Sequence, residues 1–142
     1  MKFRQILLAL AAASQIATAA PPDTQAVEFF NLNLGHYFIT ADASEAVGID
    51  GGSAGPGWTR TGRSFGAWLN PANAPAGSAA VCRFYSIGAN SHFFTASAAE
   101  CATLKALETT QRQEAIQFGH PFTGWIYEGI AFTAAVPAGL VA

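Results

Sequence analysis

Residues 91–100 read SHFFTASAAE, and residues 36–45 read HYFITADASE. Both stretches begin with an aromatic run, which favours a β-strand. Both end with a polar residue that is followed three positions later by glutamate, a pattern typical of a helix N-terminus in which the two side chains cap each other's backbone. Each stretch therefore predicts a strand that leads directly into a helix. The predicted capping pairs are Asp42 with Glu45 and Ser97 with Glu100.

Matching stretches flank each of these segments in the same order. VEFF at residues 27–30 precedes the first segment, and VCRFY at residues 81–85 precedes the second. GWTRTGRSF at residues 57–65 and GWIYEGIAF at residues 124–132 close the two segments. When the chain is aligned on Thr40 and Thr95, the strand and capping segments match without gaps. The chain thus predicts two copies of one strand-strand-helix-strand unit.

We expect an α+β fold made of two tandem ββαβ repeats, over about residues 26–68 and 80–134, with mainly antiparallel sheet and a pseudo-twofold relation. The Pro/Ala/Asn stretch from Asn70 to Ala80 is the predicted connection. Two repeats leave strand edges open, so dimer formation is compatible with this fold.

The two predicted helices differ in length. Gly51-Gly52 follows soon after Glu45, which predicts a first helix of about one turn or a 3₁₀ segment. The second helix has room to continue through Thr109 toward Phe118. Residues 109–121 form an insertion that has no counterpart in the first unit.

Composition limits the classes of function. The chain has 142 residues, of which 51% are hydrophobic and 11% are charged, which suits a single folded domain. The formal net charge of -2 offers no basic surface for a phosphate backbone, so we expect no nucleic-acid partner.

The N-terminus has the pattern of a secretory signal peptide. Lys2 and Arg4 precede an apolar run, and small residues follow up to Ala19, where we predict cleavage. Residues 20–142 would then form a single secreted or periplasmic domain without a membrane span, because the apolar run is too short to cross a bilayer. An N-terminal anchor or core helix is the alternative.

Export changes the interpretation of Cys82 and Cys101, the only two cysteines. In an oxidising compartment they predict one disulfide within the second unit. Two buried free thiols are the alternative. The first unit has Glu28 and Ala46 at the matching places and cannot form such a bond.

Taken together, VCRFYS, NSHFFTASAAEC and GWIYEGIAF, with their first-unit counterparts, resemble a repeat-of-unknown-function family of secreted bacterial proteins. Members of that family are often appended to exported hydrolases, which implies an accessory or binding role. The resemblance supplies no catalytic residues.

The residues themselves give little support for catalysis. His36, His92 and His120 are too widely spaced to suggest a metal site, and we expect no cofactor. We expect His92 to bond a neighbouring loop or carboxylate. Glu45 and Glu100 have a local role as helix caps, and Arg83 can bind an anion or pair with Glu128. The expected function is therefore not enzymatic, with a small exported hydrolase as the alternative.

Aromatic side chains are the candidate binding groups. They either fill the core or form a platform on which a sugar ring stacks while polar side chains bond its hydroxyls. Trp68 lies outside the matched segments, and we expect its ring to be the most exposed. The expected partner is a polysaccharide or a cell-envelope component, and a structural role beside another exported protein is the second alternative. The candidate ligand-binding residues are Trp68, Trp58, Trp125, Tyr127, His92 and Asn90.

Overall fold

The computed structural model describes residues 20–136. The predicted cleavage after Ala19 therefore lies outside the described residues. Its elements follow in the order β1 (Thr24–Asn31), β2 (His36–Thr40), α1 (Ala43–Asp50), β3 (Trp58–Ala67), a 3₁₀ turn (Pro71–Asn73), β4 (Ala79–Ser86), β5 (Ser91–Thr95), α2 (Ala98–Phe118) and β6 (Trp125–Ala134). We call β1–β3 with α1 the first half and β4–β6 with α2 the second half.

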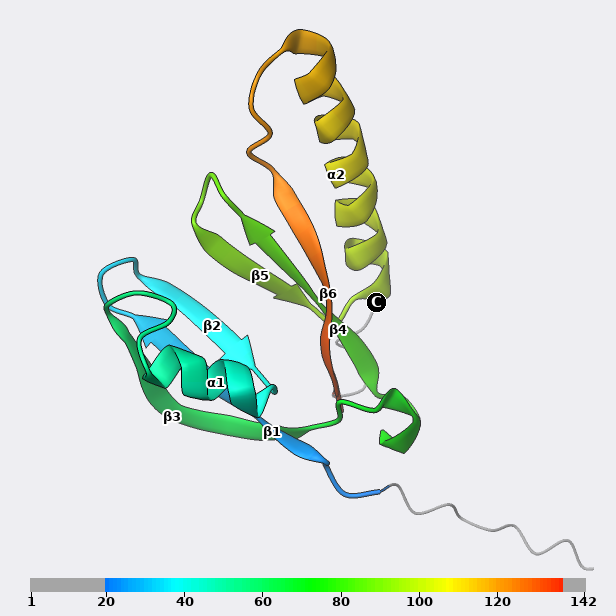
Figure 1. Ribbon diagram of the computed structural model, residues 1–142. Helices are drawn as coiled ribbons and strands as arrows, with labels where there is room; N and C mark the ends of the chain where they lie inside the picture. Colours follow the sequence, from blue (N-terminus) through cyan, green and yellow to red (C-terminus); the bar gives the residue numbers. More distant parts are fainter. Residues whose placement is uncertain (1–19, 137–142) are drawn as a thin grey trace, which may run out of the picture.

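Each half contains one three-stranded antiparallel sheet. The strand orders are β2-β1-β3 and β5-β4-β6, so the first strand of each half lies at the centre of its sheet. One helix packs beside each sheet, with α1 on the first sheet and α2 along the second (Figure 1). The expected α+β class with antiparallel pairing is confirmed.

Three apolar clusters hold this arrangement together. One lies under α1, one lies under α2, and the third joins the two halves. Phe29 and Phe84 are fully buried at the centres of the first two. The cluster that joins the halves contains Ala26, Ala41, Ala67, Val81, Phe132 and Ala134.

The predicted N-caps are Asp42 and Ser97, and both are confirmed. Asp42 Oδ1 accepts hydrogen bonds from the backbone N–H groups of Ser44 and Glu45, at 2.7 and 3.3 Å. Ser97 Oγ accepts from the backbone N–H of Glu100 at 3.2 Å. Hydrogen bonds from the Ser44 hydroxyl and from these amides lower the pKa of Asp42.

The predicted hydrogen bond from each glutamate side chain back to the N-cap backbone amide is wrong. The backbone N–H of Asp42 donates to Thr40 Oγ1, and that of Ser97 donates to Thr95 Oγ1, each at 3.0 Å. Each threonine ends the preceding strand and already satisfies the amide that a glutamate would have bonded. Glu45 is therefore available for a different partner.

The first helix is longer than predicted. It runs eight residues as an α-helix, with Gly48 inside it rather than at its end. A Cβ at Gly48 would lie 3.0 Å from Ser53 Oγ, so glycine at this position lets the following loop pack closely. α2 is continuous over 21 residues and absorbs most of the 109–121 insertion before Gly119 ends it in a left-handed conformation. Within residues 20–136, neither helix has the length and apolarity needed to cross a bilayer.

The disulfide between Cys82 and Cys101 is confirmed, and it ties β4 to the first turn of α2. The counterpart of Cys82 differs from the prediction. Cys82 pairs with Thr95 as Val27 pairs with Thr40, so Val27 rather than Glu28 occupies the matching place. Val27 and Ala46 fill in the first half the space that the disulfide fills in the second.

The expected exposure of Trp68 is wrong, because this side chain is only 4% exposed. Its Nε1 donates to the carbonyl oxygens of Pro21 and Ala20 at 3.1 and 3.3 Å. Its backbone exchanges two hydrogen bonds with Thr133 of β6, at 3.0 and 2.8 Å. Trp68 thus joins the N-terminal segment to the second half.

Candidate functional site

A cleft opens between α1 and the face of the second sheet that α2 does not cover. We call it the inter-sheet cleft, and its volume is about 410 Å³. The first half supplies α1 with Glu45 and the aromatic side chains Phe38 and Trp58, whereas the second half supplies Arg83, His92 and Glu128. The lining residues that matter for its chemistry are Phe38, Ser44, Glu45, Trp58, Arg83, His92 and Glu128.

Arg83 is the central charged group of the cleft. Its Nη1 donates to both carboxylate oxygens of Glu45, at 3.0 and 2.9 Å, and its Nε lies 2.8 Å from Glu128 Oε2. All three side chains are partly exposed, with Arg83 the least at 22%. Charge-assisted bonds of this kind are short and directional, so Arg83 fixes the position of α1 relative to the second sheet. The pairing of Arg83 with Glu128 is confirmed.

A β-bulge aims Glu128 into the cleft. Phe84 pairs with Tyr127, but the next residue, Arg83, pairs with Gly129, so Glu128 is an extra residue in β6. Gly129 has a φ of 128°, a conformation that favours glycine. The bulge breaks the alternation of the strand and places Glu128 on the same face as Arg83.

An aromatic wall faces these charges. The ring of Phe38 lies 4.7 Å from the His92 ring and 6.2 Å from the Trp58 ring, measured between centroids. The Arg83 guanidinium lies over the Phe38 ring at 5.5 Å. Trp58 is only partly buried, so part of its indole is available to a ligand.

His92 lies beside the ion pair of Arg83 with Glu128. Its Nε2 is 3.4 Å from Glu128 Oε2, which confirms the expectation that it contacts a carboxylate. Burial lowers the pKa of His92 from its usual value of 6.5, because desolvation outweighs the favourable field of Glu128. His92 is therefore neutral at neutral pH.

This lowered pKa predicts a pH dependence of stability. The unfolded chain takes up a proton at His92 below about pH 6.5, before the folded chain does, so the free energy of unfolding should fall as the pH drops through this value. Urea unfolding between about pH 7.5 and 5.5 measures it, and His92→Gln should flatten the profile. The pKa values of Asp42 and Asp50 are also lowered. Their contributions to stability are lost only when the pH falls to about 3.8 and below, outside this range. An unchanged slope in His92→Gln would contradict the assignment.

A second hollow of about 230 Å³ continues from the first and shares Ala54, Trp58 and His92 with it. The Trp58 indole therefore borders both. Here Tyr85 donates its hydroxyl to Asn90 Oδ1 at 3.0 Å. His36 Nδ1 lies 2.9 Å from the Asn90 carbonyl oxygen, so this nitrogen carries the proton and donates.

The structure gathers only some of the predicted binding residues. Trp58, His92 and Asn90 line the two connected hollows. Trp125 packs on Phe93 in the cluster under α2, and Tyr127 packs on Phe84 in the same cluster. Trp68 is buried elsewhere.

Sequence reasoning missed Glu45 and Phe38 as members of the site. The capping pattern gave Glu45 a sufficient local role, and Phe38 resembled a core residue, which in part it is. The difference in charge between the two halves was the available signal. The second half has Arg83 where the first has Glu28, and Glu128 where the first has Thr61.

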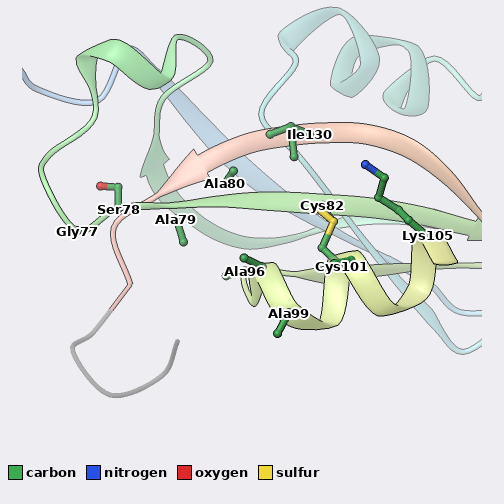
Figure 2. Close-up of a pocket in the computed structure, with 12 residues that line it drawn as sticks. Gly77, Ser78, Ala79, Ala80, Cys82, Ala96, Ala99, Cys101, Lys105 and Ile130 are labelled. Carbon is green, nitrogen blue, oxygen red and sulfur yellow. A yellow bond between two sulfur atoms is a disulfide. The ribbon is translucent and has the colours of Figure 1, made fainter. Parts of the chain in front are cut away.

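Another hollow, of about 750 Å³, lies beside the disulfide (Figure 2). Alanines dominate its lining. Lys105 reaches it, but the ammonium group lies 4.5 Å from the Tyr127 ring centroid. With so few polar groups, this hollow offers little to orient a ligand. Within residues 20–136, no three His, Cys, Asp or Glu side chains gather to hold a metal ion.

Comparison with protein families gives one match. The model for a domain of unknown function (DUF5648) matches residues 11–119. The chain belongs to this family. The match covers the first sheet, β4, β5 and α2, and so includes the strands that carry Arg83 and His92 but not β6 with Glu128. No curated protein and no solved structure matches this DUF5648 chain.

Proposed function

We propose that this chain is a secreted, non-catalytic binding module that holds an oligosaccharide in the inter-sheet cleft. The observation that carries the proposal is the partly exposed Trp58 indole, which borders two connected hollows lined with hydrogen-bonding side chains. A sugar ring stacks on such a ring face while carboxylates and an arginine bond its hydroxyls. Two hollows on either side of one indole suit an oligomer better than a single sugar.

The arrangement of charges favours binding over hydrolysis. A glycosidase needs one carboxyl group that donates a proton and a second that attacks or activates water. Here Arg83 bonds both Glu45 and Glu128. Glu45 thus joins the two halves and Glu128 holds Arg83 within the second half, which suits a fixed binding surface.

Secretion is part of the same proposal. A disulfide between Cys82 and Cys101 persists best in an oxidising compartment, and the signal-peptide pattern before Ala19 agrees with export. We place the mature domain in the periplasm or the medium, with a polysaccharide or envelope component as its partner.

We further propose that the halves are tandem ββαβ repeats related by a pseudo-twofold axis. Their element orders and sheet orders agree. Equivalent positions meet in the cluster that joins them, namely Ala26 with Val81, Ala41 with Ala96 and Ala67 with Ala134. Asn31 and Ser86, also equivalent, each accept hydrogen bonds from backbone amides of the following turn.

Titration with oligosaccharides from cell-wall and plant polysaccharides tests the binding role. Trp58→Ala should weaken binding about tenfold or more, because the stacking surface is lost. Trp125→Ala is the matched control, since Trp125 occupies the equivalent strand position outside the cleft and should leave affinity unchanged. Absence of binding to every oligosaccharide, or hydrolysis of a bound one, would overturn the proposal.

A further inference from the structure

The inter-sheet cleft has an unbalanced charge. Among the residues that line the first hollow, Glu45 and Glu128 each carry a negative charge and Arg83 carries the one full positive charge. His92 contributes none near neutral pH, because burial lowers its pKa. The lining therefore carries a net charge of about -1.

The position of the carboxylates matters as much as their number. They lie on two sides of Arg83, on its Nη1 and its Nε. An anion that approached the Arg83 guanidinium would be repelled by both carboxylates. A cation would be attracted to them, and they would accept its hydrogen bonds. Glu128 Oε2 receives Arg83 Nε and His92 Nε2, which leaves Oε1 as the less engaged oxygen of that carboxylate.

The aromatic wall also favours a cation over an anion. The faces of Trp58 and Phe38 are the negative regions of their quadrupoles and attract a cation. The Arg83 guanidinium already occupies one such face, that of Phe38, whereas Trp58 has no cation over its ring among the contacts of residues 20–136. A ligand cation near Glu128 would thus share the first hollow with a ring that has no cation over it.

The second hollow differs from the first. Its polar side chains are His36, Tyr85, Asn90, Ser91 and His92, with no carboxylate or guanidinium among its lining residues. The groove therefore joins a subsite that holds carboxylates and a guanidinium to a hydrogen-bonding one that holds neither, on either side of Trp58.

We propose that the ligand is an oligosaccharide of amino sugars in which at least one unit carries a free, protonated amine, and that this ammonium group lies beside Glu128. The proposal rests on the oligosaccharide-binding function argued above and specifies its ligand class. The neighbouring sugar unit lies in the second hollow and carries hydroxyl or N-acetyl groups. Anionic sugars are excluded by the two carboxylates.

The test compares three tetrasaccharides by calorimetry at low salt and about pH 7, where His92 is neutral and much of a sugar amine is protonated. They are the tetramers of glucosamine, N-acetylglucosamine and galacturonic acid. The glucosamine tetramer should bind about tenfold more tightly than the acetylated one, as expected for one charge pair in a partly buried site, and added salt should reduce the difference. The uronic acid tetramer should bind most weakly.

Two variants locate the effect. Glu128→Gln should bring the ratio of the affinities for the free and acetylated tetramers to about one. Glu100→Gln removes an equivalent negative charge outside the cleft and should leave the preference intact. Thermal unfolding of each variant confirms that it is folded.

The outcomes separate this inference from the proposed function. Equal affinity for the free and acetylated tetramers, a preference for uronic acid, or a preference that survives in folded Glu128→Gln would each overturn the ligand class and leave oligosaccharide binding in place. If no oligosaccharide of any charge binds, the proposed function fails, and this inference fails with it.

Discussion

Replacing Trp68 with alanine is expected to lower the free energy of unfolding by about 3–5 kcal/mol, the range for removing a large buried aromatic side chain. The ring is 4% exposed, and its Nε1 bonds the carbonyl of Pro21. The variant therefore loses packing and the attachment of the N-terminal segment together. Denaturant unfolding monitored by circular dichroism measures the change.

Two companion variants separate these contributions. Trp68→Phe keeps most of the ring but removes the N–H donor, so it should cost less than the alanine variant. Trp58→Ala removes the same side chain from a partly exposed place and should cost less than Trp68→Ala. If Trp68→Ala unfolded at the same denaturant concentration as the unmodified protein, the burial of this residue would be in error.

Loss of the disulfide is the second change with a large expected effect. The bond closes a loop with a sequence separation of 19 residues, for which the chain-entropy estimate of stabilisation is about 3 kcal/mol. The Cys82→Val/Cys101→Ala double variant tests this with a matched pair, because the first half carries valine and alanine at these places. The packing is thus one that the fold already accepts.

Unfolding in denaturant under oxidising conditions gives the difference in stability directly. Adding a reductant to the unmodified protein should produce a similar loss, but slowly, since Cys82 and Cys101 are 4% and 8% exposed. A loss below about 1 kcal/mol in the double variant would show that valine and alanine replace the bond, and that the cross-link adds little.

The local structure was largely predictable, because short patterns determine it. The strand-to-helix transitions follow from Thr40-Ala-Asp42 and Thr95-Ala-Ser97, and the disulfide follows from two cysteines in one unit. The length of α1 was not predictable, because the effect of Gly48 depends on a loop that packs against it.

The cleft was predictable only in part. The partly exposed Trp58, His92 and Asn90 were candidates from their residue types. The role of Glu45 depends on which face of the second sheet receives α1, and that is decided by packing between elements about 40 residues apart. Trp68 failed as a candidate for a related reason, since its burial comes from Ala20, Pro21 and β6.

The exchange of charges between the halves also limits how the chain can assemble. In the second sheet, Arg83 receives the α1 carboxylate of Glu45, but the matching residue of the first sheet is Glu28. A helix from another molecule that docked there in the same manner would bring Glu45 or its counterpart Glu100 against Glu28, and like charges repel. We therefore expect this repulsion to oppose head-to-tail growth into an open filament.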